Sequence, residues 1–240
     1  MGFIGFGTFV NVIGIVIGGL IGLIFGKLLT KSLQDTLKMS SAVAVIFIAL
    51  GGTLSDMLKV NSDGTIETVG TMMMITSLSI GSLIGEIINI NAHIESFGTW
   101  LKSVTGNNGD STFIEGFVTA SLTVCIGAMA VIGAIQDRLM NDYSILFAKS
   151  ILDLIIIMIL TASLGKGCIF SAVSVGMFQG LITLLAGFLQ PIMTEEALHN
   201  ISYVGNILIF CVGINLMFGQ KIRVANFLPS LIIAYIWSLF

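Results

Sequence analysis

Long apolar stretches alternate with short polar segments along the whole chain. A helix of about 20 apolar residues suffices to cross the roughly 30 Å hydrocarbon core of a bilayer. Eight such runs are present, at 3–26, 39–58, 69–90, 113–135, 144–164, 168–190, 197–218 and 223–240. The pattern predicts an all-α integral membrane protein with about eight transmembrane helices. The first run lacks the charged region and cleavage site of a signal peptide, so we expect it to be retained.

Composition narrows the class of protein further. Of the 240 residues, 55% are hydrophobic and 10% are charged, whereas soluble domains carry about 25% charged residues. This number of charges is too small to cover a water-facing surface. We therefore expect the protein to lie in the lipid bilayer. The net charge of −3 offers no basic surface for nucleic acid. The three cysteines lie in apolar runs and match neither a metal site nor a disulfide framework, and no cofactor is expected.

The distribution of Lys and Arg predicts how the chain is oriented, because short loops rich in these residues stay cytoplasmic. Loops of one parity hold most of the cations, namely Lys27, Lys31, Lys38, Lys102, Lys166, Lys221 and Arg223. Loops of the other parity hold Lys59 and Arg138, and Lys149 lies inside the fifth run. This asymmetry predicts that both termini lie outside the cytoplasm.

The chain also resembles itself at a constant shift of 162 residues. The shift places Gly14 on Gly176 and Gly18 on Gly180, and it places Gly51 on Gly213. Because five crossings separate the first run from the sixth, the second copy would enter from the opposite side. The pattern predicts an inverted-topology repeat, common in secondary transporters. The units would be 1–90 and 167–240, around central spans in 112–166, with 91–111 as a cytoplasmic linker.

Glycines four residues apart form smooth strips on several of the predicted helices. Such strips let another helix approach closely in lipid. The predicted helix-packing residues are Gly14, Gly18, Gly22, Gly26, Gly81, Gly85, Gly176 and Gly180. We expect them to pack within the bundle or across a dimer.

Polar residues inside apolar spans are candidates for function because burying them in lipid is unfavourable. Lys149 and Asp153 are four apart on one face of the fifth span and can neutralise one another. They are either a structural ion pair or a site where Asp153 exchanges a proton or cation while Lys149 tunes it.

Further polar side chains lie in the fourth span and in the two glycine-rich units. Glu115, Thr119 and Thr123 recur every four residues, with Ser121 beside them. One interpretation is that these side chains bind a cation or a solute. The other is that the hydroxyls bond to carbonyls of their own helix and that Glu115 lies at the membrane interface. Asn11, Gln179, Asn206 and Asn215 lie well inside other spans, where each could bind a solute or only bond a neighbouring helix.

The whole chain resembles a bacterial membrane family catalogued as domain of unknown function 554, and the central motif from 113 to 153 is the most specific part of the likeness. The similar segments are Phe113-Ile-Glu-Gly-Phe-Val-Thr-Ala-Ser-Leu, Cys125-Ile-Gly-Ala-Met-Ala, Gln136-Asp137, Asp142-Tyr-Ser, Lys149-Ser-Ile-Leu-Asp153, Phe170-Ser-Ala, Gln179-Gly180 and Ile222-Arg-Val-Ala-Asn-Phe-Leu-Pro229. The resemblance implies a protein of the bacterial cytoplasmic membrane, sometimes labelled a transport protein, and it brings no substrate.

These observations leave three hypotheses about function. The first is a secondary transporter of a small solute or ion, working by alternating access and coupled to a proton or cation, and forming a homodimer. The second is a channel lined by the polar stripes, and the third is a scaffold or sensor that transports nothing. No nucleophile motif, phosphate-binding loop or dinucleotide motif is present, so we do not expect an enzyme.

Overall fold

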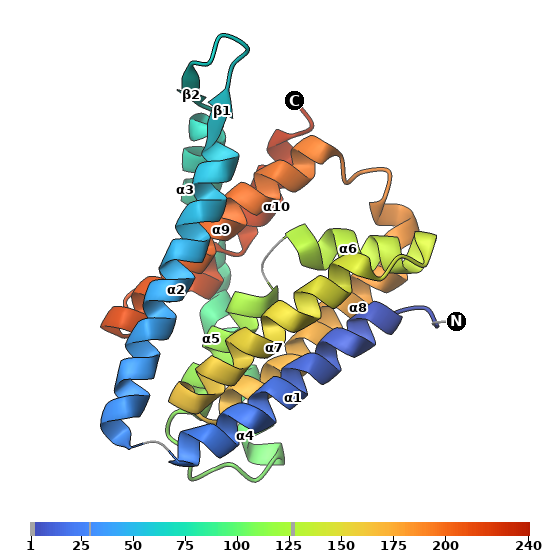
Figure 1. Cartoon of the computed structure of the whole chain (residues 1–240). Coiled ribbons are helices and arrows are strands. Elements are labelled where there is room, and N and C mark those ends of the chain that lie inside the picture. Colours follow the sequence, from blue (N-terminus) through green and yellow to red (C-terminus); the bar gives the residue numbers. More distant parts are fainter. Residues whose placement is uncertain (1–2, 29, 126–127) are drawn as a thin grey trace. The chain divides into compact units, whose positions relative to one another are not determined.

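The protein is described by a computed structural model over residues 3–28, 30–125 and 128–240 (Figure 1). Its described elements are α1 (Phe6–Leu28), α2 (Lys31–Met57), β1 (Leu58–Val60), β2 (Ile66–Thr68), α3 (Thr71–Ile88), α4 (Ile90–Val104), α5 (Phe113–Cys125), α6 (Ala128–Met140), α7 (Ser144–Leu164), η1 (Lys166–Phe170), α8 (Ser171–Leu189), α9 (Glu195–Phe218), η2 (Val224–Phe227) and α10 (Pro229–Trp237). The predicted all-helical class is confirmed.

The predicted number of eight membrane spans is not confirmed. Among the described residues, five helices are long and apolar enough to cross a membrane, with a sixth if α5 and α6 form one bent span. The axes of that pair differ by 62°. The runs 39–58 and 223–240 contain shorter apolar helices, 42–57 and 224–237. Both helices are shorter than the roughly 17 residues at which a helix can begin to span the bilayer.

Two structured segments lie between the predicted spans. β1 and β2 pair antiparallel, with Lys59 opposite Glu67, and their turn contains Gly64 at φ 82°. The predicted linker contains α4, whose amphipathic residues include Phe97 and Trp100, with stacked rings 5.6 Å apart. Asp63-Gly64 between alternating residues is a hairpin signal in the sequence.

The chain divides into two compact units that each combine distant segments. Unit 1 comprises 1–41, 94–125 and 129–191, and unit 2 comprises 42–93, 126–128 and 192–240. Each unit therefore combines segments from the N-terminal and the C-terminal halves of the chain. The division into consecutive units proposed from the sequence stays a prediction about the repeat.

Unit 1 is organised around the seam between α1 and α7, which lie side by side (Figure 1). A Cβ atom added to any of four glycines of α1 would meet a backbone carbonyl of α7. In order, Gly14, Gly18, Gly22 and Gly26 face the carbonyl oxygens of Ser150, Leu154, Met158 and Ala162. The two helices are thus parallel and in backbone contact over three turns, an arrangement that only glycine permits.

α8 also packs against α1 in unit 1, but in the opposite direction. Gly5 lies near Thr183, whereas Val12, further along α1, lies near Gly176. No neighbour lies within 4 Å of a Cβ placed at Gly180, and the nearest atom at Gly176 is 3.5 Å away, so close helix packing at these two glycines stays a prediction. The spacing of these glycines matches that in α1, but only Gly176 has a neighbour in contact, and Gly180 is open.

Unit 2 combines α3, α9, α10 and residues 42–57 of α2. Gly81 and Gly85 of α3 approach the backbone of Ser230 and Asn226, so α3 and α10 are antiparallel. Asn226 anchors this contact, because its Oδ1 accepts from the Asn91 backbone at 2.7 Å and its Nδ2 donates to Glu86 at 2.6 Å. Glu86 also pairs with the exposed Arg223. These residues therefore hold the end of α3 against η2.

Candidate functional site

Four of the predicted polar residues come together in unit 1 and form what we call the polar cluster: Asn11, Lys149, Asp153 and Gln179. They come from α1, α7 and α8. The glycines of α1 bring it close to α7, and α8 packs against α1. Each of the four side chains belongs to a residue no more than 6% exposed. Two charges and two amides are thus enclosed by three apolar helices.

Lys149 has one partner inside the cluster and one beside it. Its ammonium forms an ion pair with Asp153, four residues further along α7. It also donates a hydrogen bond to the Val124 carbonyl oxygen at 2.7 Å, one residue before α5 ends. The last carbonyls of a helix lack intrahelical donors and carry partial negative charge. Lys149 therefore satisfies both a carboxylate and the end of a helix at the α5–α6 break.

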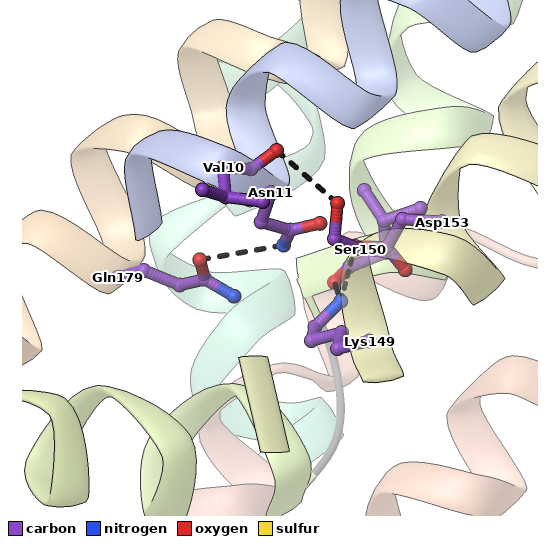
Figure 2. Close-up of polar contacts among 7 residues, drawn as sticks. Val10, Asn11, Lys149, Ser150, Asp153 and Gln179 are labelled. Atoms are coloured by element: carbon purple, nitrogen blue, oxygen red, sulfur yellow. Dashed lines mark hydrogen bonds and ion pairs between the residues drawn. The ribbon is translucent and has the colours of Figure 1, made fainter. Parts of the chain in front are cut away.

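The two amides form the other half of the cluster. Asn11 Nδ2 donates to Gln179 Oε1 at 3.4 Å, and the Asn11 side chain also interacts with Asp153. In the described part of the chain, Asn11 Oδ1 and Gln179 Nε2 are buried without a hydrogen-bond partner. Figure 2 shows both atoms on the side of the amide pair where Ser150 and the ion pair lie. The cluster thus offers one unused acceptor and one unused donor.

Ser150 ties the cluster to the α1–α7 seam. Its hydroxyl donates to the Val10 carbonyl oxygen at 3.1 Å (Figure 2). Val10 precedes Asn11 on α1, and Ser150 follows Lys149 on α7. The bond therefore fixes the relative height of the amide and the ammonium.

The predicted stripe on α5 makes mainly local contacts. Thr123 Oγ1 donates to the Thr119 carbonyl at 2.8 Å, which is a bond within the helix. Ser121 instead bonds Ser174 of α8 at 2.9 Å. Glu115 lies in the first turn of α5, where a helix favours an anion. A ligand role for these residues stays a prediction.

Asn206 and Asn215 lie in unit 2 and are not part of the polar cluster. Asn206 Nδ2 donates to Asp56 at 3.1 Å, and Gly52 leaves the room for it. Asn215 accepts from the backbone of Lys221 and Ile222, each at 2.9 Å, and donates to the Ile222 carbonyl at 2.7 Å. Asn215 therefore closes the turn after α9.

Asp137 of α6 is a site residue that the sequence reasoning missed. It is fully buried, and its two carboxylate oxygens accept backbone hydrogen bonds from Gly5 at 3.2 Å and Gly7 at 3.0 Å. These N–H groups belong to the start of α1, which has partial positive charge and unpaired donors. Asp137 therefore joins α6 to the N-terminus of α1. Its presence in the Gln136-Asp137 motif was the only signal available.

Replacing Asp137 with asparagine is expected to lower the free energy of unfolding by about 2 kcal/mol, because an amide NH₂ would face a backbone N–H. Thermal unfolding of the purified protein in detergent measures the change. Asp142→Asn is the matched control, since that exposed side chain accepts hydrogen bonds from the backbone and side chain of Ser144, which an asparagine oxygen can also accept. Equal stability of Asp137→Asn and wild type would contradict the role given to Asp137.

The polar cluster combines features suited to ion or solute binding. Among the residues that the structure describes, no group of three or more His, Cys, Asp or Glu could hold a metal ion. The available groups are a carboxylate, an ammonium, a helix-end carbonyl and two amides. This set can exchange a proton or a monovalent cation at Asp153 and can hydrogen-bond a polar group at the amides.

Comparisons with known proteins place this chain in a family. A family model described as "Protein of unknown function (DUF554)" matches residues 6–239. The chain is 28% identical to the uncharacterized membrane protein YdfK of Bacillus subtilis over 228 residues, covering 95% of this chain and 93% of YdfK. It is 23% identical to the uncharacterized protein YqgA of Escherichia coli over 232 residues, covering 95% and 94%. No solved structure matches significantly. The match to the family model covers nearly the whole chain, which therefore belongs to the DUF554 family, whose function is unknown.

Proposed function

We propose that this protein is a secondary transporter in which the polar cluster binds a small solute or ion. The observation that carries the proposal is the unused donor and acceptor of Gln179 and Asn11 beside a buried ion pair. A buried polar atom without a partner is unfavourable by about 1–3 kcal/mol, and a binding site is one reason why a native protein retains such atoms. A bound solute group would satisfy both atoms.

The break between α5 and α6 supports a role for ion coupling. Transporters bind ions where a discontinuous helix exposes backbone carbonyls near the middle of the membrane. Here the Lys149 ammonium lies between Asp153 and the Val124 carbonyl, a position suited to a cation. Protonation of Asp153, or binding of a cation, would release Lys149 and free the end of α5. The proposal therefore assigns Asp153 as the coupling residue and Lys149 as its exchanging partner.

Three helix contacts support an inverted repeat. The elements that the repeat would relate are α1 with α8, α2 with α9 and α3 with α10, and the members of each pair lie in contact in one unit. In each pair, residues later in one helix meet residues earlier in the other. Ile46 of α2, for example, meets Gly213 of α9, whereas Gly52 meets Asn206. Each pair is therefore antiparallel. Helices that meet across a twofold axis in the membrane plane must be antiparallel. Alternating access would then exchange the two halves.

The proposal also covers location and assembly. Both named relatives come from bacteria, and one is named a membrane protein. Together with the distribution of Lys and Arg, this favours the bacterial cytoplasmic membrane with both termini outside. A homodimer would give this short chain a stationary scaffold.

Charge displacement measured on solid-supported membranes tests the proposal without knowledge of the solute. Protons and sodium ions are the probes, delivered as a jump in pH or in sodium concentration. The wild type is expected to give a transient current as the ion enters the cluster, and Asp153→Asn is expected to give none. Glu67→Gln, which removes an exposed carboxylate in the hairpin, is the matched control and should keep the current.

A second variant separates loss of function from loss of folding. Lys149→Met/Asp153→Leu removes both charges and should stay folded without a transient current. A wild-type current in this double variant would refute the role of the pair. A sustained current in the wild type would instead identify a channel, and the absence of any wild-type response to both ions would favour a scaffold.

A further inference from the structure

A groove of about 970 Å³ runs between α1 and α8 in unit 1, with Phe97 of α4 contributing to its wall. Its volume lies within the range of roughly 300–1,000 Å³ that is typical of ligand pockets. The lining is mostly apolar, and Gly176 and Gly180 form part of it. The absent side chain of Gly180, which has no neighbour within 4 Å of a Cβ, leaves part of this space unfilled.

One polar atom in this lining has no partner. Among the described hydroxyls of the groove, Ser174 bonds Ser121 and Thr183 bonds the Gln179 carbonyl. Thr8 Oγ1 is buried and has no hydrogen-bond partner, and the whole residue is 7% exposed. An apolar groove with a single unused hydroxyl matches a ligand that has an apolar body and one polar group.

The groove lies beside the polar cluster along the same two helices. Thr8 is one turn from Asn11 on α1, and Thr183 is one turn from Gln179 on α8. The hydrogen bond between Asn11 and Gln179 therefore lies directly next to the polar side of the groove. A ligand held at Thr8 could pass its polar group to the unused Gln179 donor and Asn11 acceptor.

We propose that this groove binds a small amphipathic solute, with one apolar chain and a neutral head group that both donates and accepts a hydrogen bond, as an alcohol, primary amide or protonated carboxylic acid does. The hydrogen-bonding complementarity to Thr8 favours this occupant over a second copy of the chain. The inference rests on the proposed transport function only where it calls this solute the substrate class of the transporter. Binding of the solute to the groove can be measured without transport.

Fluorescence quenching by ω-bromodecanol tests this binding in the detergent-solubilised full chain. Trp100 is the reporter because its ring stacks on Phe97 of the groove wall. Trp237 is replaced with phenylalanine to remove the second tryptophan. We expect saturable quenching of Trp100 in this background.

Two glycine variants separate the groove from the detergent around it. Gly180→Phe should fold, because nothing lies within 4 Å of a Cβ there, and it should abolish saturable quenching by filling the groove. Gly187 lies two turns further along α8, is equally open and lies outside the groove. Gly187→Phe should therefore keep the saturable quenching. Equal quenching in both variants would overturn the proposal. The proposal would also be overturned if the Trp237→Phe parent showed no saturable quenching and Gly180→Phe dissociated a dimer. That result would identify the groove as an interface between copies of the chain.

The head group is tested separately. Thr8→Val keeps the shape of the side chain and removes its hydroxyl, so it should weaken ω-bromodecanol binding by up to about tenfold. Binding of bromodecane, which lacks the hydroxyl, should not change. Equal effects on both probes would overturn the assigned role of Thr8. If Gly180→Phe loses binding but keeps a normal proton-driven current, the groove and the coupling site act independently. If the wild type binds the probe normally but gives no current, only the transport proposal is contradicted.

Discussion

Asp153→Ala, with Lys149 in place, is expected to lower the free energy of unfolding by about 3–5 kcal/mol, the range found when one partner of a buried ion pair is removed. Lys149 would keep one neutral partner, the Val124 carbonyl, for a buried positive charge. Thermal or denaturant-induced unfolding in detergent measures the loss. Lys59→Met, which removes one member of the exposed Lys59–Glu67 pair, is the control and should change stability by less than about 1 kcal/mol.

The double variant Lys149→Met/Asp153→Leu is expected to recover most of that loss, because apolar side chains of similar volume often replace a buried ion pair without destabilisation. An unchanged stability of Asp153→Ala would mean that Lys149 reaches water, and it would contradict the burial described for the pair. Recovery of stability without recovery of charge displacement would show that this pair is retained for function.

The second large effect is expected at the α1–α7 seam. Gly18→Leu should destabilise the protein by about 3 kcal/mol, at the upper end of the usual effect of overpacking, because its Cβ would meet the Leu154 backbone carbonyl. Backbone cannot rotate away as a side chain can, so the two helices must separate. The fraction of monodisperse protein after detergent extraction and the unfolding temperature both report this change.

Gly187→Leu is the matched control for the seam. Like Gly18→Leu, it replaces a glycine of an apolar helix with leucine, but no atom lies within 4 Å of a Cβ placed at Gly187. It should leave stability unchanged or raise it by up to about 1 kcal/mol, since glycine is a poor helix former. Similar losses in Gly18→Leu and Gly187→Leu would show that the α1–α7 contact is not as close as described.

The sequence was most informative where local spacing decides structure. The ion pair of Lys149 and Asp153 follows from four-residue helical spacing, and the glycine strip of α1 follows from the same period. Spacing cannot tell whether a neighbour covers a strip. Gly176 and Gly180 repeat the spacing of Gly14 and Gly18, but they line a groove.

Contacts between distant segments could not be predicted in this way. Asp137 bonds the backbone of Gly7, 130 residues earlier, and no periodic pattern marks a carboxylate that caps another helix. The predicted number of spans was not confirmed for a different reason: hydropathy shows that a run is apolar, whereas the bend between α5 and α6 and the short helices at 42–57 and 224–237 depend on backbone geometry. The hairpin turn at Asp63-Gly64 did have a sequence signal.

The parallel seam between α1 and α7 has a consequence for how the protein is made. Ser150 leaves the ribosome more than a hundred residues after Gly14, which corresponds to a delay on the order of ten seconds at ordinary rates of synthesis. During that interval the newly inserted α1 has neither the α7 carbonyls beside its glycines nor Gln179 beside Asn11. Nascent chains halted before α7 should therefore depend on the membrane insertion machinery to shelter this helix, and their α1 should be the first segment that quality-control proteases recognise.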